Sequence, residues 1–106
     1  MQIENIYKEL KNCQLCESGY DFSENYLGKS KSYFSVLKAR KELPSIEALV
    51  LLEVSLKEKA RMFDDDGYEI YKIRRKQLLS MSEEVGRIRA DRCKRRLSGL
   101  LYERTV

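Results

Sequence analysis

Cysteine is the residue of this 106-residue chain with the most versatile chemistry, and two of the three cysteines lie close together. Cys13 and Cys16 are separated by two residues, whereas Cys93 lies far along the chain among arginines. A Cys-x-x-Cys pair is typical of half a zinc site or of a redox pair. The chain has no histidine, and one distant cysteine cannot complete a four-ligand zinc site. We therefore expect reduced cysteines, one or both of them packed in the core, with no metal and no cofactor.

Three consecutive aspartates precede a glycine at residues 64–67. A calcium-binding loop needs its acidic residues at alternating positions, so this segment does not match that pattern. We expect it to be a solvated loop between helices. Without histidine, the commonest general base, no clustered nucleophile and base can be assembled from the sequence, and we do not expect an enzyme.

Positive charge is concentrated in the last third of the chain. The whole chain carries 21 basic and 17 acidic residues, a formal charge of +4. Residues 72–99 alone hold ten basic and three acidic residues, which is 10 − 3 = +7. Such a stretch is either a solvated helix face or a surface for phosphate groups or an acidic protein partner.

Composition and apolar spacing favour an all-α protein. Five glycines and one proline are too few for the turns of a small β-sandwich or barrel. The longest apolar run, Ala48–Leu52, is far shorter than the ~20 residues that a membrane span needs. The first residues show no secretory signal pattern, so we expect a cytoplasmic protein. Apolar residues at steps of three and four predict helices over residues 3–15, 18–27, 31–38, 46–62 and 68–102.

Serine and glycine residues mark the ends of the shorter helices. Ser18 is placed to cap the second helix, and Gly28 to end it in the left-handed conformation. Ser30 is placed to cap the third helix, and Pro44-Ser45 to start the fourth. The last segment is either one long helix or two helices broken near Gly86.

The predicted helices carry distinct apolar faces. In the third helix, Phe34 and Leu37 are expected to face inward. The apolar face of the fourth consists of Ile46, Leu49, Val50, Leu52, Val54 and Leu56. The last segment adds a larger set, which the first four helices can cover only in part: Tyr71, Leu78, Leu79, Met81, Val85, Ile88, Leu97, Leu100 and Leu101. We expect two copies to pair through this set, unless the segment folds back on its own domain.

One stretch resembles a known DNA-binding motif. Residues 27–38 read Leu-Gly-Lys-Ser-Lys-Ser-Tyr-Phe-Ser-Val-Leu-Lys, and Pro-Ser-Ile-Glu-Ala-Leu follows at 44–49. This order of turn, serine, short helix, basic loop and Pro-Ser resembles the helix-turn-helix of the phage-repressor/Cro-like (XRE-type) family. The resemblance implies a lambda-repressor-like helical bundle over residues 1–63. The C-terminal residues lie outside the resemblance, and we expect residues 68–106 to form a basic helical region that dimerises.

The resemblance implies that residues 31–38 form a recognition helix for double-stranded DNA. A short helix with small polar residues and lysines outward suits the ~12 Å wide major groove, and cations at its ends can reach phosphates. The implied function is a sequence-specific transcriptional regulator, a dimeric phage or bacterial repressor. The implied DNA contacts are Lys29, Ser30, Lys31, Ser32, Ser35, Lys38, Arg40 and Lys41.

Three positions depart from the family pattern. Glu24 stands where the family has a small residue, and Ser23 and Lys29 stand where it has apolar residues. We therefore expect the second helix to be rotated or packed differently. The alternative function is a protein-interaction module, such as an antitoxin, an adaptor or a phage inhibitor. It would keep the helix-turn-helix shape and place its basic C-terminal helix on an acidic partner.

Overall fold

The computed structural model describes residues 2–63 and 68–105, and every regular element within these ranges is helical. The acidic loop predicted at residues 64–67 lies outside the described residues. The all-α expectation is confirmed. In chain order the elements are α1 (Gln2–Asn12), α2 (Gly19–Asp21), the π-helical turn η1 (Phe22–Tyr26), α3 (Tyr33–Arg40), α4 (Ile46–Arg61) and α5 (Glu69–Thr105).

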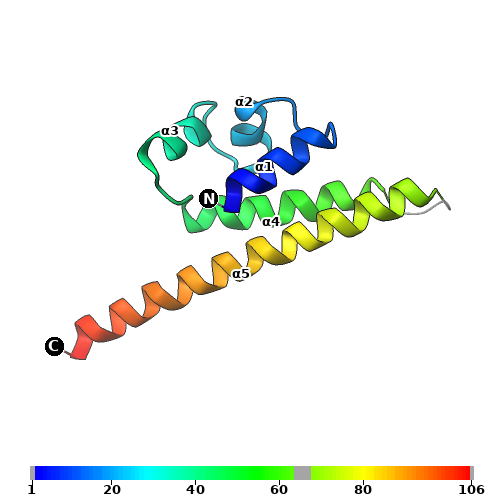
Figure 1. Ribbon diagram of the computed structural model, residues 1–106. Coiled ribbons are helices and arrows are strands. Elements are labelled where there is room, and N and C mark those ends of the chain that lie inside the picture. The colour runs from blue at the N-terminus through cyan, green and yellow to red at the C-terminus, as the bar shows by residue number, and fades with distance from the viewer. Residues whose placement is uncertain (1, 64–67, 106) are drawn as a thin grey trace.

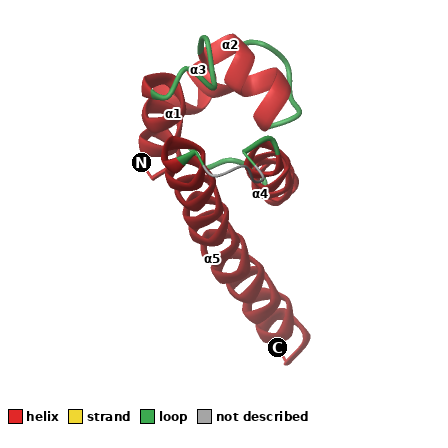
Figure 2. Cartoon of the chain, turned by 90° about the vertical axis from the view of Figure 1, so that its right-hand side faces the viewer, coloured by secondary structure: helices red, strands yellow, loops and turns green. Residues whose placement is uncertain are grey.

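Helices α4 and α5 form an antiparallel hairpin that supports the rest of the molecule (Figure 1). Their interface is the most extensive between any two elements. The shorter elements α1, α2 and α3 lie together on one side of this hairpin, as the two views show (Figures 1 and 2). Helix α5 runs on beyond the start of α4, which gives the molecule its length of 58 Å against 27 and 18 Å in the other directions.

A single apolar core joins the shorter N-terminal elements to the hairpin of α4 and α5. Helix α1 contributes Ile3, Ile6 and Leu10, which recur at steps of three and four. Phe22 and Phe34 meet edge to face with their ring centres 4.8 Å apart, and Tyr7 packs against both rings. Such aromatic contacts stabilise a core beyond the area that they bury. From α4 and α5 the core receives Ala48, Leu49, Leu52, Leu56, Ala60, Leu78, Met81 and Val85.

Helix α1 ends at Asn12, three residues before the end that its apolar spacing predicts. Gln14 adopts the left-handed conformation, and the Leu15 amide donates to the Leu10 carbonyl, which closes the helix end. The Leu15 carbonyl in turn accepts a 2.7 Å hydrogen bond from the Tyr26 hydroxyl. This long-range hydrogen bond holds residues 13–15 in a turn, although their apolar spacing predicts that the helix continues.

The predicted caps are confirmed at two helices and wrong at a third. Ser18 accepts a hydrogen bond from the Asp21 amide at the start of α2, and Ser45 accepts one from the Ala48 amide at the start of α4. Ser30 does not cap α3. That helix begins at Tyr33, two residues later than predicted, and the Ser30 carbonyl closes a turn by accepting from the Tyr33 amide.

The outer face of α4 differs from the predicted apolar face. Leu49, Leu52 and Leu56 are buried, but Val50 and Val54 are 40% and 50% exposed. A face that spans all the predicted residues is wider than one helix can bury against a single layer. The valines therefore lie on the side of α4 that faces away from the core.

Residues 69–105 form one helix that continues through Gly86. The first half of α5 folds back on the same chain, so that Leu78, Met81 and Val85 join the core. Gly86 permits the close approach of α4, since a Cβ atom there would lie 3.1 Å from a carboxylate oxygen of Glu53. The first half of α5 therefore folds back on its own domain, one of the two alternatives that the sequence left open. None of the helices within the described ranges has the length and apolar character needed to cross a membrane.

Candidate nucleic-acid interface

The connection between η1 and α3 is built from Ser23 and Gly28. The Ser23 hydroxyl donates to the Gly19 carbonyl at 2.9 Å and accepts from the Phe34 amide at 3.0 Å. Gly28 has a φ of +64°, the left-handed conformation that its place in the sequence predicts. The Lys29 amide then donates to the Ser23 carbonyl at 2.9 Å. These contacts fix the start of α3 relative to η1.

Helix α3 is anchored by its apolar side, as predicted. Phe34 and Leu37 are buried, and Phe34 packs in the aromatic group with Tyr7 and Phe22. After the loop that follows α3, the Ser45 amide donates to the hydroxyl of Tyr33, the first residue of α3, at 2.9 Å. The core therefore anchors α3 on its inner side, and this hydrogen bond ties the following loop to the start of the helix.

The outer side of α3 and the two residues before it are mainly small, polar or cationic, although Val36 is also 38% exposed. Lys31, Ser32, Ser35 and Lys38 are all exposed. The Ser35 hydroxyl donates to the Ser32 carbonyl at 2.9 Å, which leaves its oxygen free to accept. The Lys38 ammonium lies 4.7 Å from the centre of the Phe34 ring, a cation–π contact that holds its stem along the helix.

Cations flank this outer side. Lys29 is half-buried, lies over the Tyr33 ring and pairs with Glu47 at 3.7 Å, so part of its charge is balanced within the molecule. Ser30, Arg40 and Lys41 are exposed. Residues 29–41 contain five basic residues and no acidic one. Of the eight residues that the sequence singled out, seven are exposed and Lys29 is half-buried.

The end of α3 has a feature that sequence reasoning missed. Lys41 has a φ of +54°, a left-handed conformation that a lysine rarely adopts. It caps the helix, and the next amide, of Glu42, donates to the Leu37 carbonyl at 3.0 Å. Glycine is the usual residue at such a position, and no glycine is present here to reveal it. The conformation turns the basic loop away from the helix axis.

Two arginines of α5 form ion pairs within the molecule. The Arg89 Nε donates to a Glu53 carboxylate oxygen at 2.8 Å, and Arg95 pairs with Asp91 at 3.0 Å. This contact with Arg89 lowers the pKa of Glu53 below its ordinary value. Other cations of α5 are exposed along the helix: Lys72, Lys76, Arg87, Lys94 and Arg96.

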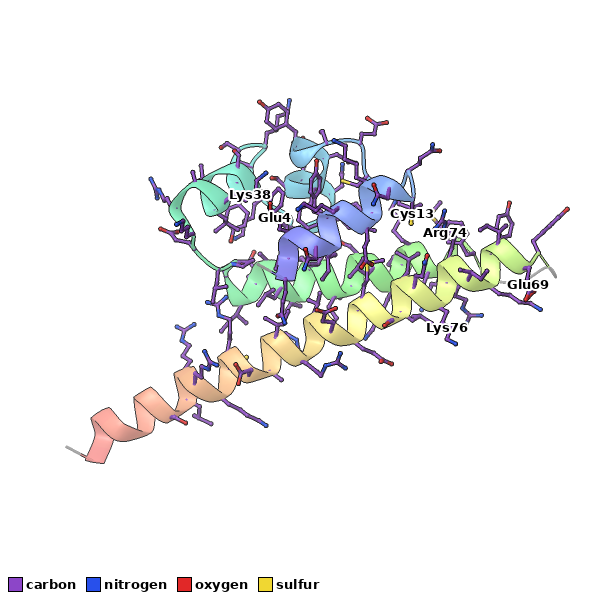
Figure 3. The ribbon with its side chains drawn as sticks, in the orientation of Figure 1. Glu4, Cys13, Lys38, Glu69, Arg74 and Lys76 are labelled. Atoms are coloured by element: carbon purple, nitrogen blue, oxygen red, sulfur yellow. The ribbon has the colours of Figure 1, made fainter. Side chains whose placement is uncertain are left out.

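The Cys-x-x-Cys pair is divided between two environments. Cys16 is buried, its thiol donates to the Ser18 carbonyl at 3.3 Å, and burial together with the nearby Asp21 raises the pKa of the thiol to about 11. Cys13 accepts a 2.8 Å hydrogen bond from Arg74 of α5 (Figure 3). All three cysteines are free, and Cys16 packs in the core as predicted. Within the described ranges, no group of three or more His, Cys, Asp or Glu side chains could hold a metal ion.

The fold and the site define this chain as an all-helical protein with a basic, polar helix anchored on its core. By its sequence the chain belongs to a family of unknown function (DUF6626), whose model matches residues 3–98. The match spans the core, the basic surface of α3 and most of α5. Neither a curated protein nor a solved structure matches the chain.

Proposed function

We propose that this protein binds double-stranded DNA with α3 as its recognition helix and acts as a sequence-specific transcriptional regulator. The observation that carries this proposal is the outer side of α3. Apart from the exposed Val36 it is mainly polar and cationic, it has no acidic residue from 29 to 41, and Phe34 and Leu37 anchor it from behind. Small polar side chains let a helix approach base edges closely, and lysines add donors for guanine.

The dimensions and the charges are consistent with insertion into the major groove. A helix with its side chains is about 10–12 Å wide, and the major groove is about 12 Å wide. Arg40 is the last residue of the helix, Lys41 follows it, and Lys29 lies in the segment before it. Cations in these places can pair with the phosphates that border the groove, whereas Lys31, Ser32 and Ser35 are placed to meet bases. In this proposal η1, the turn at Gly28 and α3 together act as a helix-turn-helix.

The proposed regulator is a homodimer that pairs through the outer half of α5. This half extends beyond the body of the molecule, and every residue from 93 to 99 is exposed (Figure 1). A helical segment that packs on no other element is only marginally stable in water, and a second helix against it would stabilise it. Leu97, 56% exposed, is an apolar contact available to that second helix. Two-fold pairing would present two recognition helices to half-sites about 34 Å apart.

Binding of an acidic protein through α5 is the weaker candidate. Lys72, Lys76 and Arg87 are exposed on this helix. However, Arg74, Arg89 and Arg95 are engaged by Cys13, Glu53 and Asp91. Glu53 lies outside residues 72–99, so its pair with Arg89 reduces the +7 charge of this stretch, whereas Asp91 is already counted in it. Residues 72–99 also carry three acidic residues, whereas residues 29–41 carry none.

Selection of bound duplexes from a random DNA pool tests the proposed function. We expect enrichment of a defined, two-fold symmetric sequence. Fluorescence anisotropy with that duplex should show an affinity that falls steeply with salt, because phosphate contacts release counterions. The Lys31→Ala variant should change the preferred base at one position, with a loss of ~1–3 kcal/mol for the selected site.

The matched control is Lys72→Ala, which removes the same charge from an exposed position on α5. It should leave the preferred sequence unchanged. If no sequence is enriched and both variants weaken binding equally, DNA binding by α3 is refuted and a general attraction between a basic protein and a polyanion remains.

A further inference from the structure

A cavity of about 590 Å³ lies where the start of α1, the end of α3, the loop before α4 and the middle of α5 meet. This volume falls within the range of small-molecule sites in proteins, about 300–1,000 Å³. Its walls are mostly apolar: Ile3, Leu37, Leu43, Pro44, Leu49 and Ile88. The cavity therefore offers an apolar surface large enough for the body of a small organic molecule.

A guanidinium group without a partner lines this apolar space. The Nη1 atom of Arg92 is buried and has no hydrogen-bond partner among the described residues. Arg89 and Arg95, three residues to either side, are both held by carboxylates, Glu53 and Asp91. A buried donor that lacks an acceptor is costly. An anionic acceptor beside the Arg92 guanidinium would offset this cost.

The remaining charged residues of the cavity leave an excess of positive charge. Lys38 and Lys41 line it with Arg92, and Glu4 and Glu42 are the acidic residues (Figure 3 labels Lys38 and Glu4). Three cations against two carboxylates give a net +1, and neither carboxylate forms an ion pair with Arg92 in the described part of the chain. An anion with a single negative charge would balance the site.

We propose that this cavity is a binding site for a small monocarboxylate with an apolar body, such as a medium-chain fatty acid. The carboxylate accepts from the Arg92 guanidinium, since this pairing is geometrically matched and charge-assisted. The chain or ring of the ligand lies against Leu37, Leu49 and Ile88, where its burial adds affinity. Binding here does not require that the protein bind DNA, because Arg92 and the apolar walls lie outside the surface that contacts DNA in the proposed function.

Isothermal titration calorimetry of the full chain tests the site with three probes at one ionic strength: decanoate below its self-association limit, acetate and decanol. Decanoate combines charge and apolar body, whereas acetate has only the first and decanol only the second. We expect decanoate to bind one molecule per chain, at least ~10-fold more tightly than either control. Decanol lacks the hydrogen bond to a charged group, which contributes this much, and acetate lacks the apolar chain whose burial adds affinity. Equal affinity for decanoate and decanol would overturn the proposal.

The variant Arg92→Met should weaken decanoate binding at least ~10-fold and leave decanol binding unchanged. Arg96→Met is its control, since it removes the same charge from an exposed position one turn along the same helix. An equal loss in both variants would show attraction to a basic helix and refute the site. Should Arg92→Met fail to fold, Leu43→Glu places a negative charge at an exposed wall residue of the cavity. It should weaken decanoate binding, while Val54→Glu on the outer face of α4 should not, and the reverse result would overturn the proposal.

Discussion

The backbone amide of Phe34 donates to the hydroxyl of Ser23 across a separation of eleven residues. Both residues are buried, and the same hydroxyl donates to the Gly19 carbonyl. Ser23 thereby joins three segments, α2, η1 and α3, through one side chain. It stands where the resemblance to the repressor family implies an apolar residue. The departure in sequence corresponds to a specific polar contact at the base of α3.

Replacing Ser23 by alanine should destabilise the protein by about 2 kcal/mol, because the buried Phe34 amide loses its acceptor. Urea unfolding followed by circular dichroism measures this change. Ser35→Ala is the control, since that serine is exposed and bonds only within its own turn. Its unfolding free energy should change by no more than ~0.5 kcal/mol. Equal effects would show that the Ser23 contact does not stabilise α3.

The features that the sequence predicts correctly are those that local chemistry decides. The caps at Ser18 and Ser45, the left-handed Gly28 and the inward Phe34 and Leu37 all follow from residue type and spacing. Local signals of this kind depend on neighbours within one turn of a helix. The set of exposed residues on α3 follows from the same spacing.

The features that were missed depend on contacts between distant segments. The Tyr26 hydroxyl ends α1 early by holding Leu15, and no local signal marks this contact. The π-helical geometry of η1 likewise accompanies the fit of Phe22 and Tyr26 into the aromatic core. The pairing of Arg89 with Glu53, 36 residues apart, reduces the charge that the sequence assigns to the C-terminal helix. Tertiary packing overrides local preference at each of these places.

Gly28→Ala should destabilise the protein by about 2 kcal/mol. The left-handed conformation disfavours any side chain, and a Cβ atom at this position would collide with Leu51 of α4. Gly99→Ala provides the matched control, because a Cβ there meets no atom within 4 Å and the residue lies within α5. That substitution should raise helix stability by roughly 0.5–1 kcal/mol. Thermal unfolding of the two variants should therefore shift in opposite directions, and shifts of the same sign would contradict the assignment of Gly28 to a left-handed turn.

Glu53→Gln should show a pH-dependent loss of stability. Arg89 lowers the pKa of Glu53 in the folded state below its ordinary value of 4.5, so the unfolded state takes up the proton first as the pH falls. The stability that the charged pair contributes is present above pH 4.5 and is lost below it. At pH 7 the variant should be about 1 kcal/mol less stable than the wild type.

The difference between the two proteins should shrink as the pH falls below 4.5, because the wild-type carboxylate also becomes neutral. Urea unfolding at pH 7 and at pH 3 measures both values. The lowered pKa of Asp21, which accepts from the Glu17 amide, contributes equally in the two proteins and cancels. A difference that stays constant with pH would mean that the Glu53–Arg89 pair contributes no charge interaction.

Leu97→Glu should convert the proposed dimer to a monomer. Leu97 lies on the half of α5 that extends beyond the body, and a charge there cannot be buried against a second copy. Sedimentation equilibrium at micromolar concentration measures the mass. Leu79→Glu, at an exposed leucine on the half of α5 that packs on α4, should leave the dimer intact. A wild-type protein that sediments at 12.5 kDa at all concentrations would refute pairing itself.

Lys41→Gly separates the stability of the fold from the proposed binding of DNA. Lys41 adopts a left-handed conformation at the end of α3, which costs a side-chain-bearing residue about 1–2 kcal/mol. Glycine avoids this cost but gains freedom in the unfolded chain, so the net stabilisation should be about 0.5 kcal/mol. The same substitution removes a cation that would contact phosphate.

DNA affinity should therefore fall for all sequences alike, and the slope of its logarithm against the logarithm of salt concentration should decrease by about one. A more stable protein that binds DNA less tightly is the expected pair of results. If Lys41→Gly instead leaves both the affinity and the salt slope unchanged while Lys31→Ala weakens binding, the end of α3 does not lie against the DNA backbone.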